Sequence, residues 1–329
     1  MVTIIIPNYN GYAFLRDCLE ALMPQLNDRV HALVVDNGST DESVGFLTEL
    51  GSQNPEQYDK YKEIDAILLP SNTGFAGAVN AGIKHSRTKY VILLNNDTKV
   101  LPGFVGSLVA AMEQDEHVFA GSACMLQMHA PERIDDAGDE YCALGWAFAR
   151  GKGKPVQQYQ TMMEVFAACG GASIYRRSVF DEIGLFDESF FAYLEDIDVG
   201  YRARIHGYRN IYVPQAKVLH VGSGFSGSRH NAFKVSLASR NSVYLAWKNM
   251  PSVQWWLNAP LLFVGRMVKA VFFAGKGLGR VYLKGLYEGH LQCKKPGNRS
   301  KKMHLNRKHL KAYCQIQLLL WRNMFKIEH

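Results

Sequence analysis

Four short apolar runs, rich in β-branched residues, alternate with helical patterns along the first hundred residues of the chain. The runs occupy residues 2–6, 32–35, 65–69 and 90–94. Between them, apolar side chains recur at helical intervals in residues 12–23, 39–50 and 75–86. A short continuous apolar run predicts a strand buried on both faces, and parallel strands of this kind are joined by helices. The pattern therefore predicts an α/β fold built on an open parallel sheet.

The pattern is less regular after residue 115. Strands are predicted at residues 118–128, 143–148, 169–175, 210–213 and 217–220. A further helix is predicted at residues 195–206, and the pattern from residue 231 onward is helical and basic. In open α/β sheets ligands bind beyond the carboxyl ends of the strands, so polar residues at strand ends are the candidates for a site.

Asp36 and Asn72 stand at two such strand ends. The Asp36 carboxylate is suited to accept a hydrogen bond from the imide N–H of a pyrimidine base, and the alternative role is a turn residue that caps the next helix. Asn72 opens a turn that contains Gly74 and leads into a helix. The backbone N–H groups of such a turn can hold a phosphate, although small residues there also serve helix–strand packing.

Asn96 and Asp97 directly follow the apolar run at residues 90–94. A carboxylate in this place suits Mg²⁺ or Mn²⁺, because both cations prefer oxygen ligands. The alternative role for Asp97 is to cap the helix expected after Pro102. His220 ends another predicted strand, where metal ligation and a structural role are both open.

Glu195 and Asp196 follow the apolar residues 190–194 and open a predicted helix. Partial burial raises the pKa of a carboxyl group toward the range of a general base. The alternative is that acidic residues in a first helical turn only complement the helix dipole, which is the simplest interpretation of Asp198.

Taken in order, these motifs resemble the family-2 inverting glycosyltransferases of the GT-A fold, and in particular their bacterial rhamnosyltransferase-like branch. The resemblance covers roughly residues 1–230, and it is specific because all the motifs occur together and in order. It implies an open mixed sheet flanked by helices that binds a nucleotide-sugar donor. The motifs that carry it are Val2-Thr-Ile-Ile-Ile-Pro-Asn-Tyr-Asn10, Val34-Val-Asp-Asn-Gly-Ser-Thr-Asp41, Asn72-Thr-Gly-Phe-Ala-Gly77, Leu94-Asn-Asn-Asp97, Gly170-Gly171 and Glu195-Asp196.

The resemblance also implies a role for each matching residue. The donor, expected to be a dTDP- or UDP-sugar, would be bound by Pro7, Tyr9, Asp36, Asn72, Gly74 and Asn96. A divalent metal would sit at the position of the family's D-x-D motif, where this chain has Asn95-Asn96-Asp97, and His220 would complete its ligands. Since the first acidic position is Asn here, Asp97 must supply more of the ligation. Asp196 would be the catalytic base with Glu195 beside it, and Gly170 and Gly171 would lie near the acceptor.

The charge of the chain is divided unevenly along its length. Residues 1–230 hold 19 Lys and Arg against 28 Asp and Glu, whereas residues 231–329 hold 18 against 2. On a continuous helix, five basic residues would share one stripe opposite apolar side chains: Arg266, Lys269, Lys276, Arg280 and Lys284. This pattern predicts an amphipathic helical appendage that lies on an anionic membrane surface, the alternative being that it packs on the body or on a second subunit.

Two domains are therefore expected, a glycosyltransferase domain over residues 1–230 and a membrane-associating region over residues 231–329. The amino terminus lacks the basic segment and apolar length of a signal peptide, and the six cysteines form no C-x-x-C pair. These features predict a cytoplasmic protein, peripheral on the inner face of the plasma membrane, with reduced thiols. No nucleic-acid partner is expected, and a homo-oligomer is left open.

The expected function is metal-dependent, inverting transfer of a sugar, with rhamnose as the candidate. The acceptor would be a glycan or a lipid-linked glycan of bacterial cell-surface polysaccharide synthesis. A nucleotidyltransferase is an alternative, but it needs a basic Gly-rich loop where Gly11 is followed by Tyr-Ala-Phe. A non-catalytic scaffold for membranes or nucleic acid is a second alternative. It would explain the basic residues 231–329 but would leave the acidic residues at Asp97 and Glu195-Asp196 unexplained.

Overall fold

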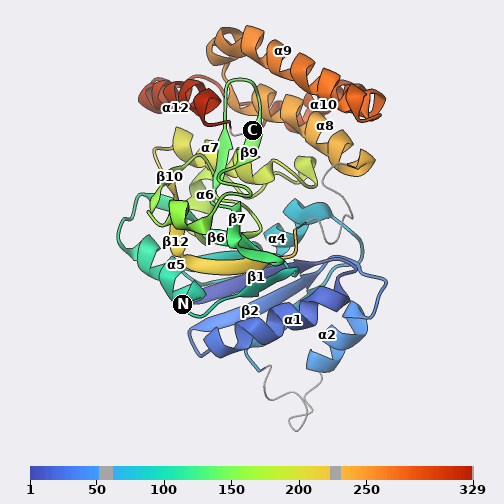
Figure 1. Ribbon diagram of the computed structural model, residues 1–329, viewed down its shortest axis with the longest axis vertical. Helices are drawn as coiled ribbons and strands as arrows, with labels where there is room; N and C mark the ends of the chain where they lie inside the picture. Colours follow the sequence, from blue (N-terminus) through green and yellow to red (C-terminus); the bar gives the residue numbers. More distant parts are fainter. Residues whose placement is uncertain (52–61, 223–230, 328–329) are drawn as a thin grey trace.

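The computed structural model describes residues 1–51, 62–222 and 231–327, and in these residues ten strands form one mixed sheet (Figure 1). Its parallel part has the order β4 (Tyr90–Leu94), β1 (Val2–Asn8), β2 (Val30–Asp36), β3 (Ile64–Leu68). All four runs of the first hundred residues are therefore strands, as predicted, and their carboxyl ends lie along one edge of the sheet.

The sheet changes direction next to β4. Strand β11 (Ala172–Arg176) runs antiparallel to β4 on one side and to β6 (Val118–Gln127) on the other. Strand β12 (Arg209–His220) then pairs parallel to β6. The remaining strands are β5 (Thr98–Val100), β7 (Ala130–Asp136) and β10 (Met163–Val165) in the large sheet, with β8 (Asp139–Tyr141) and β9 (Ala147–Ala149) as a separate hairpin.

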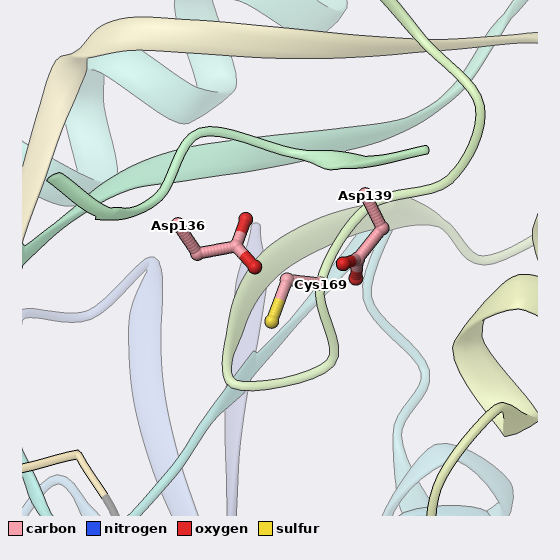
Figure 2. Close-up of side chains that lie close together, drawn as sticks. All are labelled: Asp136, Asp139 and Cys169. Carbon is pink, nitrogen blue, oxygen red and sulfur yellow. The ribbon is translucent and has the colours of Figure 1, made fainter. Parts of the chain in front are cut away.

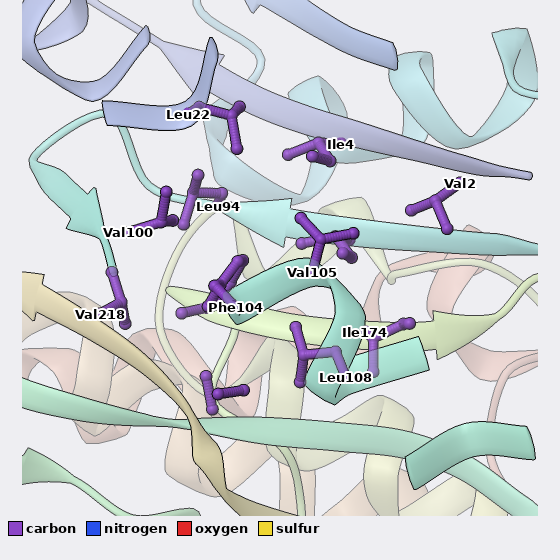
Figure 3. Close-up of a cluster of buried hydrophobic side chains, with 14 of the residues drawn as sticks. Val2, Ile4, Leu22, Leu94, Val100, Phe104, Val105, Leu108, Ile174 and Val218 are labelled. Carbon is purple, nitrogen blue, oxygen red and sulfur yellow. The ribbon is translucent and has the colours of Figure 1, made fainter. Parts of the chain in front are cut away.

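Helices cover both faces of the sheet because β1 and β4 are apolar on both sides. One face packs against α1 (Tyr12–Leu22) and α5 (Phe104–Glu113), whose Leu22, Phe104 and Leu108 meet the sheet in the cluster of Figure 3. The other face packs against α4 (Gly74–His85), α6 (Val179–Ile183) and α7 (Glu195–Ile205). The short helix α2 (Ser43–Gly51) follows β2.

Three expectations about elements are corrected. The helix predicted from residue 39 begins at Ser43, because the Ser39 hydroxyl accepts from the Asn10 N–H at 2.8 Å instead of capping a helix. Residues 143–146 form a turn, with β9 starting only at Ala147, and the Ala143 N–H bonds Leu320 in the tail. The two strands predicted at 210–213 and 217–220 are one strand, β12, interrupted by a register shift after Val213.

The last hundred residues form a helical layer that lies on the far side of α7 from the sheet (Figure 1). It consists of α8 (Ala232–Asn249), α9 (Ser252–Gly275), α10 (Gly279–Lys294), the short α11 (Pro296–Arg299) and α12 (Leu310–Arg322). Tyr244 and Leu320 of this layer share one apolar cluster with Tyr201 of α7. The domain boundary predicted after residue 230 adjoins residues 223–230, which lie outside the described residues.

The basic stripe expected on one continuous helix is wrong. Helix α9 ends at Gly275, the chain turns at Gly277 with φ +71°, and α10 begins at Gly279. Arg266 and Lys269 face the body of the protein, and the Lys269 ammonium lies 5.4 Å from the ring centre of Trp146. Burial lowers the pKa of Lys269 to about 8. Only the residues from Lys276 onward remain exposed as the stripe requires.

A buried ion-pair network holds the helical layer to α7. Lys248 of α8 donates to Asp187 at 2.8 Å and to Asp198 at 2.9 Å, and all three side chains are almost completely buried. Asp198 also accepts from Arg202 at 3.0 Å and from Asn249 at 2.8 Å. Asp198 is therefore a structural residue of this junction.

Replacing Lys248 by Ala should destabilise the protein by about 3–5 kcal/mol, because buried Asp187 and Asp198 each lose a cationic partner. Urea unfolding followed by circular dichroism measures the change. Lys89→Ala is the matched control, since Lys89 pairs with Glu113 on the open surface and its loss should barely move the midpoint. Equal midpoints for the two variants would show that the Lys248 network does not stabilise the junction.

Candidate active site

The carboxyl ends of β1, β2 and β4 are tied together by side-chain hydrogen bonds. Asp36 is fully buried, and its carboxylate accepts from Asn8 Nδ2 and from the Ser39 N–H, each at 2.9 Å. Asn8 Oδ1 in turn accepts from Asn96 Nδ2 at 2.7 Å. The predicted donor residues Asp36 and Asn96 thus belong to one network, in which Asn8 connects them. Both carboxylate oxygens of Asp36 accept hydrogen bonds from the protein.

Gly11 leaves room for this network. A Cβ at this position would lie 2.0 Å from Asn96 Nδ2, so a larger residue would displace that amide. Pro7 and Tyr9, the other donor residues predicted on this segment, flank Asn8 and are partly exposed. The segment therefore combines a fixed buried amide with two accessible side chains at the sheet edge.

The turn at Asn72–Gly74 is shaped by Asn37, which the sequence interpretation did not single out. Asn37 Oδ1 accepts from both the N–H and the hydroxyl of Thr73 at 2.9 Å, and its Nδ2 donates to the Gly74 carbonyl at 3.0 Å. Gly74 has φ +76°, and a Cβ there would lie 2.4 Å from the Phe191 carbonyl. Asn72 itself is exposed. The turn leads into the amino end of α4, where the Gly74 N–H donates to Asn72 Oδ1 at 2.9 Å and the Ala76 N–H to the Phe191 carbonyl at 3.3 Å. The helix dipole is therefore what this end offers to an anion.

Asp97, His220 and Asp135 form a chain of contacts at the same edge. His220 Nε2 lies 3.4 Å from Asp97 Oδ1, and His220 Nδ1 lies 2.7 Å from Asp135 Oδ2. Burial opposes the charged imidazolium, but the hydrogen bonds and charges of Asp135 and Asp97 outweigh it and raise the pKa of His220 to about 9. Asp135 also accepts from Lys152 at 2.7 Å. The structure thus brings together the two predicted metal residues and adds Asp135.

The donor set fits a divalent cation. Asp97 and His220 Nε2 converge, and Asp135 holds Nδ1 in the carboxylate–histidine arrangement that orients a metal-ligating imidazole. His220 would release its proton on binding, because only the neutral ring ligates a metal. The Asn96 side chain is engaged with Asn8, to which its amide nitrogen donates a hydrogen bond. In the Asn95-Asn96-Asp97 motif, Asp97 is the residue whose carboxylate could ligate a metal.

Gly170 and Gly171 lie between this edge and the predicted base. The Gly171 carbonyl accepts from the Asn95 N–H at 2.8 Å, which continues the pairing of β11 with β4. The Gly170 N–H points to Asp196 Oδ2 at 3.4 Å. A Cβ on Gly170 would lie 3.1 Å from the Phe75 ring of α4. The glycine pair therefore joins the strand end that carries Asp97 to the helix that carries Asp196.

Two further aspartates, Asp136 of β7 and Asp139 of β8, gather beside Asp196. One ligand atom each of Asp136, Asp139 and Cys169 lie within 4.8 Å of one another, and Figure 2 shows the three side chains together. Asp139 also shares a hydrogen bond with Asp196. Burial raises the pKa of the Cys169 thiol well above its usual value. A protonated thiol is a poor ligand for Mg²⁺ or Mn²⁺, so this group is an acidic cluster around Asp196 and differs from the Asp97–His220 pair.

The acidic cluster cannot carry its full charge. Burial and the Asp135 charge raise the pKa of Asp136 to about 7, and burial with the charges of Asp136 and Asp196 raises the pKa of Asp139 well above its usual value. Burial also raises the pKa of Asp196, while N–H groups of Ile197 and Gly170 and the Asp139 carboxyl oppose that rise. The hydrogen bond between the two side chains raises the pKa of Asp139 and lowers that of Asp196. It therefore favours the proton on Asp139 and the negative charge on Asp196.

Glu195 has a different environment from Asp196. It is buried, its Oε2 has no hydrogen-bond partner among the described residues, and burial with the Asp196 charge raises its pKa well above the usual value. Burial without such a partner disfavours the charged form of a carboxyl group. Of the two adjacent carboxyl groups, Asp196 is the one that contacts the Gly170 N–H and Asp139.

The chain just before Glu195 has an uncommon backbone that is held by the helical layer. Phe191, Tyr193 and Leu194 have positive φ values of 65°, 70° and 72°, each of which costs about 1–3 kcal/mol for a residue other than glycine. Asn241 Nδ2 of α8 donates to the carbonyls of Phe190, Ala192 and Tyr193 at 3.0, 2.8 and 2.7 Å. Asn241 therefore fixes the loop that positions Asp196.

The sequence interpretation missed most of these supporting residues. Asp135 and Asp136 stand at the end of β7, which lies between the strands predicted at 118–128 and 143–148, where no element is predicted. The adjacent pair of aspartates at a strand end was the available signal, of the same kind as Asp97. Asn241 carried no such signal, because a single Asn in a helical pattern has no local motif.

Comparison with known proteins places this geometry in context. Over 293 residues the chain is 25% identical to the N-acetylglucosaminyl-diphospho-decaprenol L-rhamnosyltransferase of Mycobacterium tuberculosis. The alignment covers 79% of this chain and 90% of that protein. The relative is therefore similar over nearly its whole length.

Solved structures show the same fold. The mannosyltransferase PcManGT from Pyrobaculum calidifontis, in complex with GDP-Man and Mn²⁺, matches with a TM-score of 0.53 at 15% identity, covering 88% of this chain and 84% of that one. GalNAc-T7 with UDP, GalNAc and Mn²⁺ matches with a TM-score of 0.54 at 16% identity, covering 67% of this chain and 43% of that one. At these identities the likeness concerns the architecture alone, which is the GT-A fold.

The family follows from the sequence as a whole. The family model described as glycosyl transferase family 2 matches residues 3–184, which is more than half of the chain. The matched residues run from β1 past Gly170 and Gly171 and contain the edge with Asp36, Asn96 and Asp97. The predicted GT-A fold is confirmed, and the chain belongs to glycosyl transferase family 2.

Proposed function

We propose that this protein transfers a sugar from a nucleotide-sugar donor to a hydroxyl of a lipid-linked glycan, with inversion at the anomeric carbon. The observation that carries the proposal is the meeting of two groups at one sheet edge. Asp97 with His220 lies at the end of β4, and Asp196 lies beside the Gly170–Gly171 turn that pairs with that end. A site for the leaving diphosphate and a base for the acceptor are then side by side.

The proposed donor is a dTDP- or UDP-sugar, with rhamnose as the transferred sugar. The similar protein of Mycobacterium tuberculosis is a rhamnosyltransferase, and it matches 79% of this chain. The sugar acceptor of that relative is linked to a polyprenyl diphosphate, as its name states. An acceptor of the same chemical class would give this protein a step in the synthesis of a bacterial cell-surface glycan.

The proposed chemistry uses one base and no covalent intermediate. Asp196 takes the proton from the acceptor hydroxyl, and that oxygen attacks the anomeric carbon on the face opposite the nucleoside diphosphate. Asp139, whose pKa is raised, shares a hydrogen bond with Asp196, and the raised pKa of Asp196 makes it a stronger base than an exposed aspartate. The amino end of α4 at Gly74 faces the same edge and suits the anionic leaving group.

A divalent cation, when bound, would neutralise charge on the leaving diphosphate. Asp97 and His220 are the residues that would hold it, and Asp135 would orient the imidazole. Mg²⁺ and Mn²⁺ both accept a carboxylate ligand.

A donor panel tests the proposal directly. The protein is titrated with dTDP-, UDP- and GDP-sugars, and the thermal shift of each is compared with that of the free nucleotide, since a bound ligand raises the unfolding temperature. Release of nucleoside diphosphate is then measured with and without a polyprenyl-diphosphate-linked N-acetylglucosamine acceptor. Acceptor-dependent release from dTDP-rhamnose is the expected result. If no nucleotide sugar shifted the unfolding temperature, or if the rate of nucleoside diphosphate release did not depend on the acceptor, the proposed function would be refuted.

Asp97→Ala should abolish transfer and the Mn²⁺-dependent part of the nucleotide thermal shift, because the site loses its carboxylate. Direct Mn²⁺ binding by calorimetry gives a readout that does not depend on turnover. Asp17→Ala is the control, since Asp17 is an exposed partner of Lys99 and should leave both readouts intact. Full transfer and Mn²⁺ binding by Asp97→Ala would remove this residue from the metal site.

Asp196→Asn should lower the rate of transfer by about 10²-fold or more, the usual size of a general-base effect, and should keep donor binding. The change is nearly isosteric and leaves the Gly170 contact a partner. Glu195→Gln is the matched control, because Glu195 is buried, its pKa is raised by burial, and the change to Gln should affect the rate far less. If Glu195→Gln were inactive and Asp196→Asn active, the base would be Glu195.

A further inference from the structure

Helix α9 turns its apolar side outward. Every third or fourth residue from Val253 to Phe272 forms one exposed stripe along the helix, and each is apolar. Trp256 and Val271 are both 71% exposed and Phe263 is 64% exposed, far more than apolar side chains of a core helix. The α9 stripe consists of Val253, Trp256, Leu257, Pro260, Phe263, Val264, Met267, Val268, Val271 and Phe272.

The opposite side of α9 faces the protein and carries the buried polar residues of this helix together with the buried Leu262. Gln254 accepts from the Tyr201 hydroxyl at 2.8 Å, and Asn258 exchanges hydrogen bonds with Gln317 at 2.8 and 2.9 Å. The Gly265 carbonyl accepts from the Trp146 indole at 3.0 Å. This arrangement is the reverse of a helix on a water-exposed surface, which buries its apolar side.

These contacts fix α9 along the surface and oppose a spanning orientation. By length and composition α9 is the one helix in the described residues that could cross a membrane. Its contacts at Gln254, Asn258 and Gly265 are spread over its first half, and Phe273 near its end packs on Tyr282 of α10. Crossing a bilayer would expose the buried Asn258 and Gln254 to hydrocarbon, which is costly for unpaired amides.

Basic side chains adjoin the stripe. The Lys276 ammonium lies 5.1 Å from the ring centre of Phe272. Arg280 and Lys284 lie one turn apart on α10, the next helix, and all three side chains are exposed. In residues 231–327 the only acidic side chain is Glu288. Cations beside an outward apolar face match a bilayer with anionic headgroups. The basic side chains disfavour the binding of a second copy of this protein, because two surfaces of like charge would repel each other. Nucleic acid would bind the cations but would leave the apolar stripe exposed to water.

We propose that the α9 stripe is a membrane-binding face that lies in the plane of an anionic bilayer. The apolar side chains enter the acyl region of one leaflet, and Lys276, Arg280 and Lys284 meet the headgroups. The contact needs no nucleotide, metal or acceptor. The membrane proposal can therefore be tested separately from the proposed transfer reaction. Helix α9 lies at one end of the molecule, away from the sheet, where a membrane surface could reach it (Figure 1).

The full-length protein is sedimented with vesicles of phosphatidylcholine alone and of phosphatidylcholine with phosphatidylglycerol. We expect binding to the anionic vesicles that weakens with salt, and a loss of roughly tenfold or more when Lys276, Arg280 and Lys284 are all changed to Glu. Brominated acyl chains should quench tryptophan fluorescence in the parent protein, and Trp256→Phe should remove most of that quenching.

The variant with Phe263→Gln, Met267→Gln and Val271→Gln should lose vesicle binding while keeping its thermal unfolding temperature, because these side chains are exposed. Leu68→Gln is the control, since Leu68 is 48% exposed on β3, far from α9. Vesicle binding by the triple Gln variant equal to that of the parent would overturn the proposal. So would equal binding to neutral and anionic vesicles, or a parent dimer that the Gln changes convert to a monomer without vesicle binding.

Discussion

The pairing of β4 with β11 is the interaction on which the candidate site depends. Strand β4 is parallel to β1 on one side and antiparallel to β11 on the other, so the start of β11 meets the end of β4. Gly171 bonds Asn95 across this pair, and Gly170 next to it contacts Asp196. The residues that would serve the donor and those that would serve the acceptor are thereby held within one short stretch of paired backbone. A purely parallel sheet would place β11 with its amino end at the opposite edge.

The site also concentrates like charges in a buried place. Asp97 and Asp135 share the His220 imidazole, whose pKa their charges raise, while Asp136 and Asp139 surround Asp196. A buried group of carboxyls can keep only part of its charge, so protons are distributed by hydrogen bonding instead of by the intrinsic acidity of each residue. Asp135 pairs with both His220 and Lys152 at 2.7 Å, whereas Lys152 acts on Asp136 through its charge alone, and the burial of Asp136 outweighs that effect. Adjacent aspartates on one strand therefore end in opposite protonation tendencies.

How much of this could be predicted depended on the range of the interactions involved. Strands β1, β2 and β4 were predictable because both of their faces are buried, which leaves a continuous apolar run in the sequence. The meeting of Asp97 with His220 was expected only through the family resemblance, because 123 residues separate them and no local pattern joins them. The run at 143–148 was apolar for a different reason, since helices α9 and α12 cover it, and periodicity does not distinguish the two kinds of burial. The periodicity of α9 was visible, but which of its sides faces inward is decided by Tyr201, Gln317 and Trp146 far along the chain.

Helix α8 carries the residue that shapes the loop before Asp196, and this has a consequence for how relatives of this protein diverge. Asn241 holds three carbonyls of residues 190–193, and Lys248 on the same helix bonds Asp187 and Asp198 on either side of that loop. Evolution of the carboxy-terminal helices is therefore not free of the catalytic half of the chain. A lineage that exchanged these helices to reach a different cellular surface would also have to re-establish the backbone that aims Asp196. The carboxy-terminal helices and the loop of residues 190–194 should consequently be inherited as a single unit, and a recombination breakpoint near residue 231 would separate groups that contact one another.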